Sequence, residues 1–215
     1  MKAFMLTVAA AFAVSCSSPE KKTEREASAL QMDTLFERYY AERMKLFPLE
    51  ATLNGDNEYN DQLPCEICDS YRSQLKTFYE KYLKALANYD RTQLTASEQI
   101  SYDVLKREME IGNEGLRFHD NYQPIQQFWS TPITMGQLGS GSGNQPFKTV
   151  KDYDNFLSRI SAFYSWCDSA IVYMRKGISS GEVPPKILME RTLPQMKNMV
   201  VTDPKQSVFY GSIKD

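Results

Sequence analysis

Apolar positions recur at helical spacing between Thr149 and Gly177, the longest regular stretch in the chain. Successive members are three or four residues apart, as one buried stripe on a helix requires. They are Tyr153, Phe156, Ile160, Phe163, Cys167, Ile171, Met174 and Ile178. Thr149 with Asp152 predicts a capping box at the start, and Gly177 predicts a left-handed stop at the end. At 1.5 Å per residue the helix is about 40 Å long. We therefore expect it to form the centre of the fold.

A second helical face precedes Pro48. Its members are Met32, Phe36, Tyr39, Arg43 and Phe47, with Leu35 and Tyr40 beside them. Because proline cannot continue a helix interior, this helix should stop before Pro48. Residues 49–63 contain Asn54-Gly55 and several Asp and Asn residues, a composition typical of a loop.

Two more helices are predicted between this loop and residue 115. Pro64 suits a first helical turn, and the stripe that follows it to about Tyr89 is Tyr71, Leu75, Phe78, Tyr82 and Leu86. Thr95 with Glu98 forms a capping box of the preferred residue types and starts the next helix. The buried positions predicted for that helix, which ends at the glycines 112 and 115, are Ile100, Val104 and Ile111, flanked by Leu105 and Met109.

The helical period lapses between Phe118 and Phe147, where three prolines and the run Gly139-Ser140-Gly141-Ser142-Gly143 occur. Long irregular connections inside compact domains are often functional. We expect a mobile lid or a segment that packs on a missing partner. A phosphate-binding role is less supported, because no strand precedes the run and no Lys-Ser/Thr pair follows it.

The last predicted helix runs from about Pro185 to Val200, with a kink at Pro194. No alternating strand of convincing length is present, so the predicted fold class is all-α. We expect antiparallel helices with one long central helix and a long irregular connection, forming part of a larger helical fold.

The amino terminus has the pattern of an export signal. Residues 1–15 hold one charge, Lys2, and a run of apolar and small residues that is too short to span a membrane. Ala13-Val14-Ser15-Cys16 resembles the lipobox of bacterial lipoproteins, which implies cleavage before Cys16, lipidation of its thiol and a membrane-anchored position in the cell envelope. An ordinary signal peptide with an incidental cysteine is the alternative. Residues 16–26 are polar and are interpreted as a tether, and residues 27–215 as the helical domain.

Charge and composition exclude some classes of protein. The formal charge of the whole chain is −2, and removal of Lys2 with the signal makes it −3, which argues against nucleic acid as a partner. With 42% hydrophobic and 24% charged residues, the chain is globular rather than disordered.

Candidate chemistry is sparse. His119 is the only histidine, and a zinc enzyme of the usual kind needs several ligands. Cys65 and Cys68 form a C-x-x-C motif at a predicted helix start, where a thiol pKa can fall and where oxidation is possible in an exported protein. A redox motif expects a βαβ pattern and a structural zinc expects a second ligand pair. Since both are missing from the sequence, structural or incidental cysteines are the favoured interpretation.

Other reactive residue types are better explained by packing or solvation. Cys167 falls on the stripe of the long helix and is interpreted as a small core residue. The carboxylate pairs Glu108 and Glu110, and Asp152 and Asp154, fall where solvated helix faces are expected. No G-x-S-x-G nucleophile elbow occurs. We therefore assign no catalytic, cofactor-binding or metal-ligating residue, and whether the chain is an enzyme stays open.

A series of short motifs resembles the amino-terminal region of the bacterial family called domain of unknown function 885. In order they are Phe47-Pro48-Leu49-Glu50-Ala51-Thr52 with Gly55, Leu94-Thr95, Ser101-Tyr102-Asp103-Val104-Leu105, Thr149 through Asp152-Tyr153, Leu157-Ser158-Arg159-Ile160, Gly177, Gly181, Pro184-Pro185 and Leu193-Pro194-Gln195-Met196. The resemblance covers roughly residues 35–210. It implies a largely helical, often lipid-anchored protein related to zinc metallopeptidases, whose His-Glu-x-x-x-x-His metal motif follows far downstream of this region.

Two interpretations follow. In the first, the chain is the amino-terminal helical portion of such a metallopeptidase-like lipoprotein and forms a wall of its substrate cleft. This portion has no metal motif, so it is inactive alone, and zinc is expected only in full-length relatives. Its partner is the missing carboxyl-terminal domain or a peptide substrate. In the second, it is a free-standing helical lipoprotein that binds a peptide or a partner protein through a groove beside the connection 118–147.

Overall fold

The computed structural model describes the backbone of residues 19–214 and the side chains from residue 31 onward. This part of the chain contains helices, turns and loops and no strand, which confirms the all-α class. The α-helices are α1 (Pro19–Leu46), α2 (Pro48–Leu53), α3 (Asp69–Leu86), α4 (Ala96–Gly115), α5 (Thr131–Gly139), α6 (Val150–Ser180) and α7 (Lys186–Asn198). Short 3-10 helices are η1 (Arg91–Gln93), η2 (Asp120–Tyr122), η3 (Pro204–Gln206) and η4 (Val208–Ile213).

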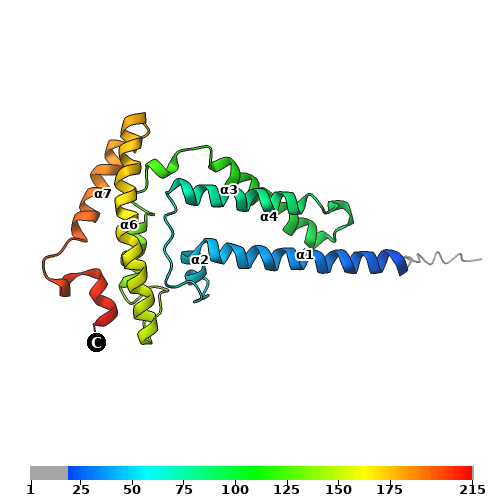
Figure 1. Cartoon of the computed structure of the whole chain (residues 1–215), viewed down its shortest axis with the longest axis horizontal. Helices are drawn as coiled ribbons and strands as arrows, with labels where there is room; N and C mark the ends of the chain where they lie inside the picture. The colour runs from blue at the N-terminus through cyan, green and yellow to red at the C-terminus, as the bar shows by residue number, and fades with distance from the viewer. Residues whose placement is uncertain (1–18, 215) are drawn as a thin grey trace, which may run out of the picture.

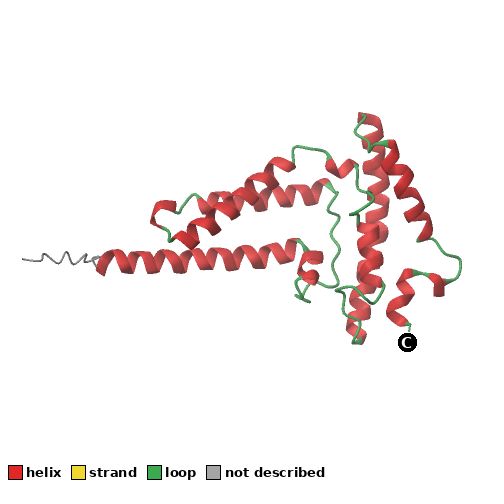
Figure 2. Ribbon diagram, turned by 180° about the vertical axis from the view of Figure 1, so that it is seen from behind, coloured by secondary structure: helices red, strands yellow, loops and turns green. Residues whose placement is uncertain are grey.

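The helices are arranged as an arm and a crossing element. Helix α1 and the hairpin of α3 and α4 lie side by side and form the arm, and α6 crosses the end of the arm (Figures 1 and 2). Helix α7 and the carboxyl-terminal segment lie on the other side of α6. The extended connection from α2 to α3 runs along α6, so α6 is the central element that the sequence predicts.

The core of the arm is built by three helices. Its buried residues are Met32, Leu35, Phe78, Tyr82, Leu86, Leu94, Leu105 and Met109. The capping box of Thr95 and Glu98 is confirmed. The predicted face of α4 is wrong, because Ile100, Val104 and Ile111 are 65%, 61% and 52% exposed.

Helix α4 instead contacts α3 through Leu105, Met109 and Gly112. A Cβ atom on Gly112 would lie 2.6 Å from the ring of Tyr79, so the missing side chain lets this aromatic ring approach the backbone of α4. The line of buried residues on α4 is therefore set by the close approach of α3, which hydrophobicity alone does not reveal.

The most deeply buried line on α6 is displaced by one residue from the predicted stripe, although Ile160, Phe163, Cys167 and Met174 of that stripe are half-buried and pack against the core clusters. Phe156 is buried as predicted, but the other buried residues are Arg159, Trp166, Ala170, Tyr173 and Gly177, each one position before a predicted one. Of the predicted residues, Ile171 and Ile178 are 45% and 70% exposed. The side of α6 that faces the core carries an arginine and a tryptophan because the extended connection 54–68 supplies polar partners there.

Helix α6 begins as predicted and ends later than predicted. The capping box of Thr149 and Asp152 is present, but the left-handed residue is Gly181, with φ +80°, rather than Gly177. Gly177 lies inside the helix, where a Cβ atom would come within 2.7 Å of the carbonyl oxygen of Glu182 and 3.1 Å of the Cβ of Tyr122. It is therefore a close-packing position.

Three other boundaries correct the sequence interpretation. Residues 19–26, expected in a tether, begin α1, in keeping with their content of Glu, Lys and Arg, which favour helices. Helix α2 forms inside the predicted loop 49–63, with Pro48 in its first turn. Helix α3 starts at Asp69 rather than Pro64, because a disulfide-closed turn at Cys65–Cys68 precedes it.

The connection 118–147 is only partly irregular. It contains α5, whose Met135 is fully buried against a cluster that includes Leu63 and Phe156. A Cβ atom on Gly139 would lie 2.4 Å from the ring of Phe209 in η4. Part of the segment thus packs on the chain's own carboxyl-terminal part, while Phe128 and Trp129 stay 68% and 76% exposed. The last predicted helix is present as α7, with Pro194 inside it.

Replacement of Gly177 by alanine tests the close packing of α6 on η2 and on the turn after α6. We expect Gly177→Ala to lower the free energy of unfolding by about 1–3 kcal/mol, since the new methyl group displaces backbone. Gly115→Ala is the matched control, because nothing lies within 4 Å of its added Cβ. It should leave stability unchanged or raise it by up to about 1 kcal/mol. Urea denaturation followed by circular dichroism measures both; equal effects would contradict the packing argument.

Candidate functional site

A groove of about 980 Å³ opens between α1, the segment 61–65 and α3, and we call it the arm groove. Apolar side chains in its lining include Leu46, Leu63, Tyr71 and Phe78. The other lining residues are mostly polar: Glu42, Lys45, Asp61, Gln62, Ser70, Ser73, Gln74, Thr77 and Lys81. An apolar groove with polar groups around it is the usual form of a binding site.

One wall of the arm groove is held in place by a buried arginine of α6. Arg159 is 0% exposed and donates hydrogen bonds to three backbone carbonyls and two side chains. The acceptors are the carbonyl oxygens of Pro48 (3.2 Å), Tyr59 (3.1 Å) and Gln62 (3.1 Å), Thr52 Oγ1 (2.7 Å) and Gln145 Oε1. The guanidinium group therefore joins α2, the following loop and the segment before α6.

Among the side chains that the structure describes, no carboxylate hydrogen-bonds to Arg159, and its five acceptors are neutral oxygens. Burial lowers the pKa of its guanidinium group to about 10, and the negative charge of Asp61 opposes that change. The group is still charged at neutral pH. Hydrogen bonds from a charged donor are stronger than neutral ones, so Arg159 serves to position the wall of the groove.

A half-buried carboxylate, Glu66, holds the same connection in place a few residues later. Glu66 accepts hydrogen bonds from Thr131 Oγ1 at 2.5 Å and from Trp166 Nε1 at 2.9 Å. Burial raises the pKa of Glu66, and the hydrogen bonds from Thr131 and Trp166 oppose this. Glu66 thereby joins the connection to α5 and α6.

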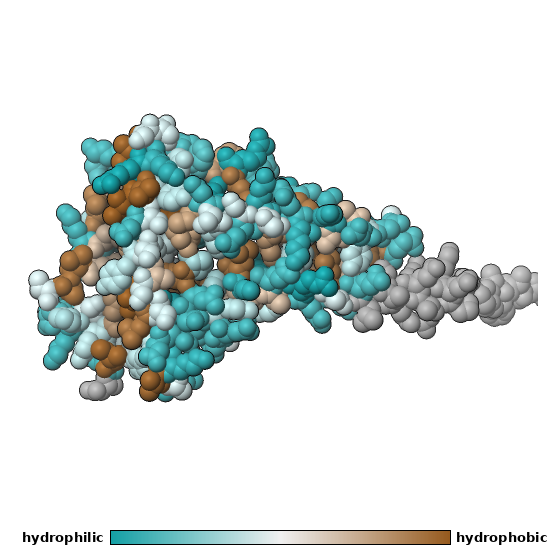
Figure 3. Space-filling model, viewed as in Figure 1, coloured by the Kyte–Doolittle hydropathy of each residue, from teal (hydrophilic) through white to brown (hydrophobic). Residues whose placement is uncertain are grey.

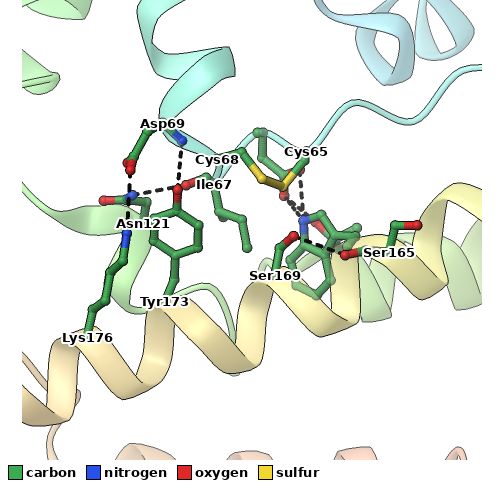
Figure 4. Close-up of a disulfide and its surroundings, with 12 residues drawn as sticks. Cys65, Ile67, Cys68, Asp69, Asn121, Ser165, Ser169, Tyr173 and Lys176 are labelled. Atoms are coloured by element: carbon green, nitrogen blue, oxygen red, sulfur yellow. Dashed lines mark hydrogen bonds and ion pairs between the residues drawn. A yellow bond between two sulfur atoms is a disulfide. The ribbon is translucent and has the colours of Figure 1, made fainter.

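Further contacts carry the connection into α3 (Figure 4). The side chain of Ile67 packs in a cluster with Trp166, Ala170 and Tyr173, while its carbonyl oxygen accepts from Asn121 Nδ2 at 3.0 Å. The backbone N–H of Asp69 donates to the hydroxyl of Tyr173 at 2.8 Å. The path from Tyr59 to Asp69 is therefore held on α6 at successive points.

The cysteines have structural surroundings. Cys65 and Cys68 form a disulfide with a Cα–Cα distance of 5.3 Å, and the N–H of Cys68 donates to the carbonyl of Cys65 at 2.9 Å. The motif therefore closes the turn before α3. Cys167 is half-buried, and burial raises the pKa of its thiol, which disfavours the nucleophilic thiolate.

His119 lies away from the arm groove, at the junction of η2 and the turn after α6. Its Nδ1 atom is 3.1 Å from both carboxylate oxygens of Glu182, and its ring stacks on Tyr122 at 4.7 Å. Among the side chains that the structure describes, no three of His, Cys, Asp and Glu come together as a metal site would need. The zinc that the sequence resemblance implies therefore does not fit the residues of this region.

The carboxylate pairs have structural partners. Glu108 accepts from Arg43 at 2.6 Å and from Tyr39 at 3.1 Å, and Glu110 lies 3.8 Å from Lys106. Hydrogen bonds from the backbone and side chain of Thr149 lower the pKa of Asp152, as expected of a capping residue. Asp154 is exposed.

Two sequence predictions concern the membrane and the connection 118–147. Cys16 lies outside the described residues, so its lipidation is not addressed by the structure. Within the described part of the chain, no helix combines the length and apolar character needed to cross a bilayer.

Beside the connection 118–147, α5, α7 and η4 surround a hollow of about 430 Å³, smaller than the arm groove.

Comparison with known families decides the relationship of the chain. The model of a family described as "Bacterial protein of unknown function (DUF885)" matches residues 48–215. The chain belongs to this family. The DUF885 match begins at the first residue of α2 and includes every later helix, so both Arg159 and its partners lie within it. No curated protein and no solved structure matches the chain.

Sequence reasoning missed the residues that hold the groove wall. Arg159, Glu66 and Trp166 were not singled out for any role. For Arg159 the reason is that a charged residue in an amphipathic helix is normally assigned to the solvated face. The available signal was positional: Arg159 lies on the same side of the helix as Phe156 and Phe163, at spacings of three and four residues.

Replacement of Arg159 tests whether this residue holds α2 and the following loop on α6. Arg159→Met leaves buried acceptors without donors and should lower the free energy of unfolding by about 2–4 kcal/mol. Arg107→Met is the matched control, since the side chain of Arg107 is 68% exposed and meets Glu110 only at 4.0 Å; its effect should stay within about 0.5 kcal/mol. Chemical denaturation measures both, and a loss for Arg159→Met no larger than that of the control would refute the assignment.

The half-buried carboxylate of Glu66 predicts a pH dependence of stability with a defined sign. Because the pKa of Glu66 is higher in the folded than in the unfolded state, the folded protein binds more protons, and stability from this group falls as pH rises above the unfolded pKa. Glu66→Gln keeps an oxygen acceptor and removes the titration. The stability of the parent minus that of Glu66→Gln should decrease between pH 4 and pH 7 in denaturation curves. A difference that grows with pH would mean that the carboxylate is favoured in its charged form.

Proposed function

We propose that this DUF885 chain is the amino-terminal helical portion of an exported, lipid-anchored protein related to zinc metallopeptidases. In this proposal the arm groove forms a wall of a peptide-binding cleft. Catalytic metal ligands come from a portion that follows in full-length relatives, so the chain alone is inactive. Cys16 carries the lipid that anchors the protein in the bacterial cell envelope.

The observation that carries the proposal is the uncovered apolar side of α7 and the residues after it. Only Thr192 is buried among the 13 residues of α7. Ile187, Leu193 and Val200 are 56%, 57% and 82% exposed. Apolar side chains that are this exposed within the described part of the chain indicate a surface that another part of the protein covers.

The arm groove supports the cleft assignment in two ways. Its wall is fixed by Arg159 and Glu66, so the groove is preformed and binding requires little ordering of the protein. Its lining holds hydrogen-bonding side chains from three segments and an ion pair of Lys81 with Glu42 at 2.5 Å. Mixed apolar and polar linings of this kind suit a peptide, which presents both kinds of group.

A free-standing helical lipoprotein that binds a peptide or partner protein is the second candidate function. One observation favours it: every wall of the arm groove comes from the described chain itself. In this case no further portion is needed, and the apolar side of α7 would be a docking surface.

The decisive experiment combines the coding sequence with a biochemical assay. If the proposal is right, sequence encoding a His-Glu-x-x-x-x-His motif follows the codon of Asp215, directly or after one frameshift. The purified chain should then retain no stoichiometric zinc by elemental mass spectrometry and should not hydrolyse a fluorogenic peptide library. A stop codon followed by unrelated sequence, with a stable chain that binds peptides, would favour the second candidate. Stoichiometric zinc together with hydrolysis would refute both.

The lipid anchor is tested by the same preparations. Cys16→Ser should move the protein from the membrane fraction to the soluble fraction after a carbonate wash, because the thiol is the attachment point of the acyl chains. Cys167→Ser is the matched control and should leave the protein in the membrane fraction. If both variants fractionate alike, the lipobox interpretation is wrong.

A further inference from the structure

A row of apolar side chains runs along the side of α6 that faces away from its core contacts. Its members recur at every seventh residue, and their exposed fractions are high: Val150 79%, Leu157 58%, Tyr164 72%, Ile171 45% and Ile178 70%. We call them the heptad row. A spacing of seven residues keeps side chains on nearly the same side of a helix, with a drift of about 20° per heptad.

The heptad row covers almost the whole of α6, which has 31 residues. Hydrophobic residues gather over the half of the molecule that contains α6 and α7 (Figure 3). Single exposed apolar residues are normal on proteins, but five of them aligned along one helix form a surface on which another helix can pack. The row therefore has the form of an unoccupied helix-packing surface.

We propose that the heptad row is a homodimer interface in which α6 of two copies of this chain pack antiparallel, with the two-fold axis at Tyr164. The row is centred on Tyr164, since two members precede it and two follow it. Antiparallel pairing then places Val150 opposite the second copy's Ile178 and Leu157 opposite the second copy's Ile171. An isologous contact of this kind pairs the same surface on both copies.

Charged residues beside the heptad row favour the antiparallel over the parallel arrangement of the two copies. Asp154 follows Val150 by four positions and Arg175 follows Ile171 by four, so both lie on one flank of the row. Neither side chain has an ion pair among the described residues. Antiparallel pairing brings Asp154 beside the second copy's Arg175. In a parallel pair in register this flank of one copy lies away from the same flank of the other, so Asp154 and the second copy's Arg175 could not meet.

The size of the row sets the expected strength of the dimer. From Val150 to Ile178 the helix rises about 42 Å, and a strip about 12 Å wide gives about 500 Å² from each copy. The total of about 1,000 Å² is at the lower end of specific interfaces. We therefore expect a reversible dimer whose population rises with protein concentration.

Cysteine cross-linking of the full chain, extracted from membranes in mild detergent, tests the pairing and its direction. Tyr164→Cys should form a covalent dimer under mild oxidation, because the two copies of this residue meet on the axis. Ser158→Cys, an exposed position of α6 off the heptad row, should cross-link no more than the parent. The single variants Val150→Cys and Ile178→Cys should not cross-link, whereas the double variant should. Efficient cross-linking by either single variant would overturn the antiparallel arrangement.

A second measurement keeps the interface testable without added thiols. Leu157→Glu with Ile171→Glu should convert the dimer to monomer in size-exclusion chromatography with light scattering. Ile100→Glu with Val104→Glu makes the same change at exposed apolar positions of α4 and should leave the dimer intact. Circular dichroism checks that both variants are folded. A parent that stays monomeric at every concentration, or dimers that resist Leu157→Glu with Ile171→Glu, would overturn the proposal.

Discussion

The guanidinium group of Arg159 is the interaction on which the arrangement of this chain depends. It emerges from α6 and donates to carbonyl oxygens at both ends of a stretch that begins at Pro48 and reaches Gln62. Backbone carbonyls in an irregular segment need partners when they are buried, and a planar group with five N–H donors can serve several at once. One side chain thereby substitutes for the ladder of hydrogen bonds that a strand or helix would supply.

A second arginine, Arg43, binds the other side of α2. Arg43 of α1 pairs with Glu50 through two hydrogen bonds, at 2.7 and 2.9 Å, and with Glu108 of α4 at 2.6 Å. Helix α2 is only six residues long, too short to be stable by itself. It is held between Arg43, which binds it to the arm, and Arg159, which binds it to α6. These two contacts, together with those of Glu66 and Tyr173, set the position of the arm relative to α6 and with it the arm groove.

The sequence predicted those parts of the fold that depend on local rules. The capping boxes at Thr95 and Thr149 and the stop before Pro48 are set by backbone chemistry within a few residues, and they were predicted correctly. The buried sides of α4 and α6 were not, because they depend on close approaches at Gly112 and Gly177 and on partners distant in sequence. Hydrophobicity favoured Ile100 and Ile171 as core residues, yet both are exposed, whereas Arg159 and Gly177 are buried.

The candidate site was hidden from sequence reasoning for the same reason. Arg159 and Glu66 are charged, and single-sequence patterns assign charged residues to solvent unless a chemical motif surrounds them. Only the packing of the connection onto α6 shows that Arg159 is buried, that Glu66 is half-buried and that both are hydrogen-bonded. The family resemblance, in contrast, rested on the order of short motifs and was confirmed by the match over residues 48–215.

Hydrogen–deuterium exchange of the Arg159→Lys variant tests most directly whether Arg159 holds the groove wall. Lysine keeps the positive charge but cannot reach the same set of acceptors with one planar group. The account predicts faster amide exchange in residues 48–63 than in the parent, with a smaller change in the hairpin of α3 and α4. Unchanged exchange in residues 48–63, or an increase of equal size in that hairpin, would contradict it.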